Sequence, residues 1–161
     1  MTTEEYNQCV DDHSDNVYRF ILKNIRDEEK ARDIVQDTFE KLWIKAETVS
    51  PEKARAYLFS AAYHTMIDAI RKDKKSKPLD EVDFDRHSYT QQYKGLNEIL
   101  EQALSKLPEI QRSVLLLRDY EGYTYGEIGQ ITQLSESQVK VYIYRARLSM
   151  KKFIGSLEAV L

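Results

Sequence analysis

The sequence predicts an all-α protein made of two small helical domains joined by a linker, with a helix-turn-helix in the C-terminal domain. Apolar residues recur with helical spacing over most of the 161 residues, and no alternating strand pattern persists. Capping and turn residues divide these apolar stretches into separate helices. A polar stretch without a clear period interrupts the helices near the middle of the chain, which is typical of a linker.

The N-terminal domain is expected to span residues 1–77 and to contain three helices. The first covers about Ser14 to Asn24, with an apolar side formed by Val17, Phe20, Ile21 and Ile25. The second begins in the acidic residues 27–29, which suit a helix N-terminus, and runs to Trp43 or beyond. Its inward residues are predicted to be Ala31, Val35, Phe39, Leu42 and Ala46. The third starts at Ser50-Pro51-Glu52, with serine as cap and proline at the first helical position, and continues to Arg71.

A basic run from Arg71 to Pro78 marks the end of this domain, and residues 78–95 are predicted to form the linker. The C-terminal domain is expected to span residues 96–161. Helical spacing resumes at Leu96, pauses at Pro108, and ends at Gly122. The linker is long enough to let the two domains bind separate targets, and it could also let them close on each other.

The helix-turn-helix follows Gly122. Residues 127–131 form its predicted first helix, residues 132–134 the turn, and Ser135 caps the second helix in a capping box with Gln138. Gly129 lets the two helices approach closely. The inward stripe is Val139, Ile143 and Ala146, and the outward face carries Ser137, Gln138, Lys140, Val141, Tyr144 and Arg145. Such a mixed face suits readout of the DNA major groove, although a plain helical hairpin with a solvated polar face is the alternative.

Composition limits how the chain could bind DNA. The net charge of −3 and pI near 5.7 predict weak free affinity, because DNA binding depends largely on phosphate neutralisation by Lys and Arg. The single cysteine, Cys9, excludes an intramolecular disulfide and fits a reducing compartment. Cys9 and His13 could face one way on a helix, but two ligands do not make a metal site, so neither a metal nor another cofactor is expected. No stretch of about 20 apolar residues and no signal peptide is present, so a cytoplasmic protein without membrane insertion is expected.

Motifs in both halves resemble a known family. In the C-terminal half these motifs are Leu107-Pro108, Gln111-Arg112, Leu117-Arg118, Glu121-Gly122, Tyr125, Glu127-Ile128, Val139-Lys140 and Arg145-Ala146-Arg147. In the N-terminal half they are the run from Ala31 to Trp43, then Arg55-Ala56-Tyr57-Leu58, Ile67-Asp68 and Ile70-Arg71. Their spacing and order resemble regions 2 and 4 of the sigma-70 family of bacterial RNA polymerase initiation factors, in its short two-domain extracytoplasmic-function (ECF) form.

The resemblance implies that the second helix docks on the β′ clamp helices of core RNA polymerase through Asp33, Gln36 and Asp37. These side chains share a helix face away from Phe39 and Leu42. Without the resemblance, the same carboxylates would be read as a solvated acidic face. A catalytic carboxylate pair is the other alternative, but no nucleophile or metal cluster accompanies it, so the chain is not expected to be an enzyme.

The resemblance also implies two DNA-binding surfaces. The downstream (−10) element, melted to single strands, would be held by Arg55, Tyr57, Ser60, Tyr63, His64, Arg71 and Lys72. Tyr63 and His64 are expected to form an exposed aromatic pair, with histidine where the family commonly has asparagine. The upstream (−35) element would be read by Ser137, Gln138, Lys140, Val141, Tyr144 and Arg145.

The partners that the resemblance implies are core RNA polymerase, through its β′ clamp helices and β flap, promoter DNA and an anti-sigma protein. The implied function is promoter recognition, DNA melting and transcription initiation. Two other functions remain open at this point. One is a stand-alone dimeric helix-turn-helix regulator, for which the sequence offers no obvious dimer interface. The other is an all-helical adaptor that binds only proteins.

Overall fold

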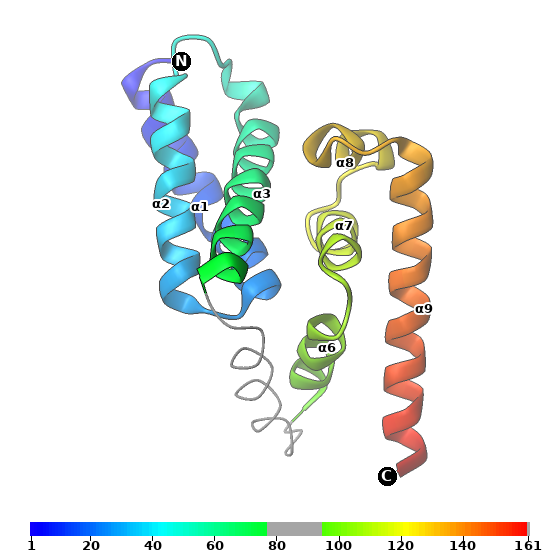
Figure 1. Ribbon diagram of the computed structural model, residues 1–161. Coiled ribbons are helices and arrows are strands. Elements are labelled where there is room, and N and C mark those ends of the chain that lie inside the picture. Colours follow the sequence, from blue (N-terminus) through cyan, green and yellow to red (C-terminus); the bar gives the residue numbers. More distant parts are fainter. Residues whose placement is uncertain (77–94, 161) are drawn as a thin grey trace.

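The computed structural model describes residues 1–76 and 95–160, which form seven helices and no strand. These helices are α1 (Thr3–Ile25), α2 (Glu28–Ile44), α3 (Pro51–Ser76), α6 (Leu96–Ser105), α7 (Glu109–Asp119), α8 (Tyr125–Thr132) and α9 (Glu136–Val160) (Figure 1). The all-α prediction is confirmed. The predicted linker at 78–95 lies almost wholly outside the described residues and stays a prediction. Within the described ranges, no helix is both long and apolar enough to span a bilayer.

Helices α1, α2 and α3 pack against one another as an N-terminal group (Figure 1). Helix α1 begins at Thr3, well before the predicted start near Ser14. A capping box explains the early start: the Thr2 hydroxyl accepts from the Glu5 amide at 3.1 Å, and the Glu5 carboxylate accepts from the Thr2 amide at 2.9 Å. The added turns are held to α2 by the Tyr6 hydroxyl, which donates to the Phe39 carbonyl at 2.9 Å.

Two further details of the N-terminal group differ from the prediction. The inward face of α2 is wider than predicted. Of the predicted residues only Val35 is not fully buried, and Ile34 and Thr38 are buried in addition. Thr38 can enter the core because its hydroxyl donates to the Ile34 carbonyl at 2.7 Å. Helix α3 continues through the basic run to Ser76. Lysine and arginine are good helix formers and suit the negative end of the helix dipole, so the change in composition after Arg71 does not end the helix.

The helix-turn-helix forms as predicted, with α8 and α9 packed together. The chain turns at Gln133, which has a φ of 62°. The close approach predicted at Gly129 is confirmed, because a Cβ there would lie 2.8 Å from the Leu134 carbonyl oxygen. The capping box at the start of α9 is also present, with Ser135 and Gln138 exchanging hydrogen bonds of 3.1 and 3.0 Å. The inward stripe Val139, Ile143 and Ala146 is buried.

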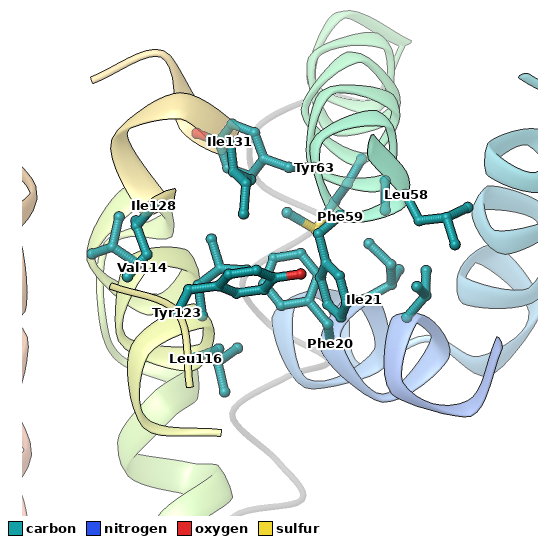
Figure 2. Close-up of a cluster of buried hydrophobic side chains, with 14 of the residues drawn as sticks. Phe20, Ile21, Leu58, Phe59, Tyr63, Val114, Leu116, Tyr123, Ile128 and Ile131 are labelled. Carbon is teal, nitrogen blue, oxygen red and sulfur yellow. The ribbon is translucent and has the colours of Figure 1, made fainter. Parts of the chain in front are cut away.

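The two halves share one hydrophobic core. Helix α1 contacts α6 and α7, and α3 contacts α8. Figure 2 shows side chains of both halves gathered in one cluster. Phe59 of α3 makes edge-to-face contacts with Phe20 of α1 and with Tyr123 of the loop before α8, at ring-centroid distances of 5.6 and 5.5 Å. The C-terminal half is therefore packed directly on α1 and α3.

Candidate nucleic-acid and polymerase interfaces

The predicted −35 surface lies open on α9. All six of its predicted residues, Ser137, Gln138, Lys140, Val141, Tyr144 and Arg145, are exposed. Hydrogen-bonding groups, two cations and two apolar side chains therefore share one solvent-facing surface, as base-edge and phosphate contacts require. Lys140 also lies 3.6 Å from Glu136 in an exposed ion pair that DNA phosphates could replace.

An exposed ion pair joins α9 to the end of α7. The Arg147 guanidinium of α9 donates to the Asp119 carboxylate at the end of α7 at 2.6 Å. The hydrogen bond from this carboxylate raises the pKa of Arg147. On the other side of the loop, Arg118 donates to the Tyr123 carbonyl at 2.9 Å. The first contact joins α9 to α7, and the second joins α7 to the loop before α8.

The predicted −10 surface on α3 is largely covered. Of its seven residues, only Arg71 and Lys72 are exposed. The expected exposed pair is wrong for Tyr63, which is 7% exposed because the C-terminal half packs over this part of α3. Burial also raises the pKa of the Tyr63 hydroxyl. His64 is partly buried and lies edge-on to Tyr63 at 5.3 Å.

The His64 ring has a defined orientation. Its Nδ1 lies 2.7 Å from the Ser60 carbonyl oxygen. A carbonyl oxygen only accepts hydrogen bonds, so Nδ1 carries the proton and donates. Nε2 is then the nitrogen left to accept a hydrogen bond when the ring is neutral. The contact with the helix backbone thus fixes the orientation of the imidazole ring.

Arg55, a second −10 candidate, points into the junction of the two halves. Its guanidinium donates to the Glu121 carbonyl at 2.8 Å and lies over the ring of Tyr123, 4.6 Å from the ring centroid. Nearby, the Ser60 hydroxyl is 3.5 Å from the Ile131 carbonyl, at the outer limit of a hydrogen bond. The remaining candidate, Tyr57, is half-buried. These contacts join residues far apart in the chain, so no local sequence signal could have revealed them.

The predicted docking face on α2 is open. Asp33, Gln36 and Asp37 are all exposed. The same face continues to Trp43, which sequence reasoning did not single out and which lies seven residues after Gln36. Trp43 is 52% exposed and its neighbour Ile44 is 77% exposed, with Tyr6 packed edge-on against the indole at 4.9 Å. An acidic face that ends in exposed apolar side chains is typical of a protein-binding surface.

The described residues offer little for catalysis by a metal. In the parts of the chain that the structure covers, no three His, Cys, Asp or Glu side chains gather to hold an ion. Cys9 is buried in the core, and burial raises the pKa of its thiol. Burial likewise lowers the pKa of His13.

Comparison with known proteins matches both halves to one family. The pattern described as sigma-70 region 2 matches residues 9–76, and that of sigma-70 region 4 matches residues 97–150. The RNA polymerase sigma factor SigV of Bacillus subtilis is 31% identical over 146 residues, covering 89% of this chain and 87% of SigV. The ECF RNA polymerase sigma factor SigM of the same organism is 29% identical over 161 residues, covering 94% of each chain.

The fold is also that of a solved sigma factor. The structure of RpoE from Bartonella quintana, determined in complex with the anti-sigma factor NepR, matches with a TM-score of 0.77 at 22% identity, covering 95% of this chain and 98% of RpoE. The matches extend over both helical halves in the order that the sequence motifs predicted. The chain therefore belongs to the sigma-70 family of RNA polymerase sigma factors, in its extracytoplasmic-function form.

Proposed function

We propose that this sigma factor docks on the β′ clamp helices of core RNA polymerase through Asp33, Gln36 and Asp37. The observation that carries this assignment is the open acidic face of α2 within the segment that matches region 2. Trp43 and Ile44 extend the surface with apolar area, which is the part of a protein interface that contributes most to affinity.

We further assign promoter reading to two helices. Arg55, Tyr57, Ser60, Tyr63, His64, Arg71 and Lys72 of α3 would hold the melted −10 strand, and the open face of α9 would read the −35 element. Residues 1–77 and 96–161 would then act as separate reading domains joined by the linker at 78–95. Unpaired bases stack on aromatic rings, whereas an intact duplex admits a helix to its major groove, so the two surfaces suit the two DNA states.

Docking explains how a chain with a net charge of −3 can use DNA. Its 24 Lys and Arg are outnumbered by 27 Asp and Glu, so free binding to DNA is disfavoured. Attachment to polymerase raises the effective concentration of both reading surfaces at a promoter. The proposal places the protein in the cytoplasm, where core polymerase works, with no enzymatic activity and no cofactor of its own. Because the solved relative RpoE was crystallised with an anti-sigma factor, control by such a protein is part of the proposal.

The docking assignment is tested with the double variant Asp33→Ala and Gln36→Ala. We expect its affinity for core polymerase, measured by gel filtration and by titration of a labelled chain, to fall by about tenfold or more, because two polar contacts of the proposed interface are lost. The matched control is Asn7→Ala with Asp11→Ala, which removes one amide and one carboxylate from an exposed part of α1. If both double variants bound core polymerase with equal affinity, the docking role of Asp33 and Gln36 would be wrong.

A further experiment separates the sigma factor from a stand-alone regulator and from an adaptor. Promoter DNA is offered to the chain alone, to core polymerase alone and to the mixture. A sigma factor binds promoter DNA specifically only when core polymerase is present. A stand-alone regulator binds the DNA without polymerase. An adaptor adds no specific binding, either alone or in the mixture.

A further inference from the structure

We propose that a hollow at the centre of the α9 reading face selects thymine in the upstream element. In this assignment Val141 contacts the 5-methyl group of the base, and donors at the rim of the hollow bind its O4 atom. The inference rests on the proposed −35 role of α9 and adds which base this chain selects there. Thymine is the base that presents an acceptor beside a methyl group in the major groove.

The hollow lies on the outward side of α9. It is lined by Ser137, Gln138, Val141, Tyr142 and Arg145. Helical spacing places Val141 almost opposite the buried stripe through which α9 packs on the rest of the C-terminal half. Val141 is 45% exposed although it is aliphatic. The side chain that points most directly toward a bound groove therefore has no hydrogen-bonding group.

An aliphatic side chain at this position discriminates between bases in two ways. Against a polar base edge, Val141 would remove donors and acceptors from water without replacing their hydrogen bonds, which is unfavourable. Against thymine it instead buries a methyl group. Burial of one methyl-sized group changes a binding constant by about fourfold. Val141 therefore favours the one base pair whose major-groove edge carries a methyl group.

The rim of the hollow offers donors. Gln138 Oε1 accepts from the Ser135 amide at 3.0 Å in the capping box, which turns the oxygen toward the start of the helix and leaves the NH₂ group to donate to DNA. The Arg145 guanidinium has donors only. The hydroxyls of Ser137 and Tyr142 can donate or accept, so they do not discriminate. Thymine O4 accepts, whereas the cytosine N4 amino group would bring donor against donor.

The methyl contact and the hydrogen bond are tested separately with base analogues. Promoter duplexes are selected from a randomised library with the complex of this chain and core polymerase. Each thymine of the selected upstream element is then replaced in turn. Uracil loses the methyl group and keeps O4, 5-methylcytosine keeps the methyl group and carries an amino group in place of O4, and cytosine differs in both respects. The two cytosines are paired with guanine.

Competition titrations with these duplexes measure the affinity of the complex. At the base pair that faces Val141, we expect uracil to weaken binding by about fourfold through loss of the methyl group. We expect 5-methylcytosine to weaken it by about tenfold or more, and cytosine to weaken it more than either.

The variant Val141→Ala links the methyl group to this side chain. Val141 is exposed and alanine is a good helix former, so the variant is expected to keep its helices, which circular dichroism checks. The fourfold effect of uracil should then disappear, while the effect of 5-methylcytosine remains. Leu148→Ala is the matched control, because Leu148 is an exposed apolar residue of the same helix that does not line the hollow. This control should keep the full effect of uracil.

The thymine assignment is wrong if the selected upstream element contains no thymine, if uracil binds as well as thymine at every position, or if Val141→Ala keeps the uracil effect. Equal binding of 5-methylcytosine and thymine would overturn the role of the rim donors. Failure of the proposed function looks different. In that case, scrambling the whole upstream element would leave binding by the complex unchanged.

Discussion

At position 129, the absence of a side chain decides how the two helices of the helix-turn-helix meet. Alanine is the better helix former by about 1 kcal/mol, and on that ground alone Gly129→Ala would stabilise α8. A Cβ at this position, however, would lie 2.8 Å from the Leu134 carbonyl oxygen, a backbone atom that cannot rotate away. Overpacking of this kind typically costs about 1–3 kcal/mol.

We therefore expect Gly129→Ala to lower the free energy of unfolding by about 1 kcal/mol, the difference between these opposing effects. Urea denaturation measures it. Gly126→Ala, in the same helix but with nothing within 4 Å of its Cβ, is the control and should leave stability unchanged or raise it. A gain of stability in both variants would show that the turn after α8 yields to the added methyl group.

At the scale of the element, capping boxes mark where three of the described helices begin. Capping boxes start α1 at Thr2, α8 at Thr124 and the recognition helix at Ser135. The box at Ser135 belongs to the DNA-reading helix itself. Two of its outward residues, Ser137 and Gln138, lie in the first turn, where fraying has the largest effect.

Ser135→Ala should lower the free energy of unfolding by about 1 kcal/mol and weaken recognition of the −35 element, because the first turn of α9 loses a hydrogen-bonded partner. Urea denaturation gives the first quantity, and comparison of promoters with intact and scrambled upstream elements gives the second. Ser135→Asp keeps an acceptor at the cap and should restore both. If Ser135→Ala weakened transcription equally from promoters with intact and with scrambled upstream elements, this turn would have no role in reading the −35 element.

Sequence periodicity predicts the interiors of these helices better than their ends. The stripe Val139, Ile143 and Ala146 was predicted correctly because one face of α9 packs on a single neighbouring layer. Helix α1 was predicted too short because its first turns are polar and depend on Thr2 and on a contact with α2. Helix α3 was predicted too short because charge composition, unlike proline, does not break a helix.

At the scale of the whole molecule, the sequence indicates the reading surfaces but not the packing between them. Asp33 and Arg145 could be placed on exposed faces because helical spacing alone determines the face. Arg19 and Glu121 form an ion pair although they are 102 positions apart, and nothing local marks either as the partner of the other. Tyr63 was expected at the surface for the same reason, since its burial is caused by the opposite half of the chain.

The packing between the two halves should respond to high pH through Tyr123. Burial between the halves raises the pKa of this hydroxyl from 10.0 to about 12, a rise that Glu121 and Glu127 reinforce and Arg55 opposes. In a chain whose halves have separated or unfolded, the hydroxyl would ionise near its ordinary pKa. The contribution of Tyr123 to this packing is therefore fully present below pH 10 and is lost as the pH rises to about 12.

Small-angle scattering between pH 9 and pH 12 should accordingly show an expansion of the free chain. Tyr123→Phe keeps the ring contacts without the ionisable group, so this variant should expand less than the wild type. Some expansion should remain because burial also raises the pKa of Tyr63. Arginine stays charged over this range, so the Arg19–Glu121 pair does not account for the change. Identical expansion of the wild type and of Tyr123→Phe would exclude this role for Tyr123.

The position of α9 makes the two proposed DNA-binding surfaces differ in access. Figure 1 shows α7 and α8 between α3 and α9, so the outward face of α9 points away from the junction that covers Arg55 and Tyr63. In this arrangement the proposed −35 surface can be reached from solvent while Arg55 and Tyr63 remain in contact with the C-terminal half.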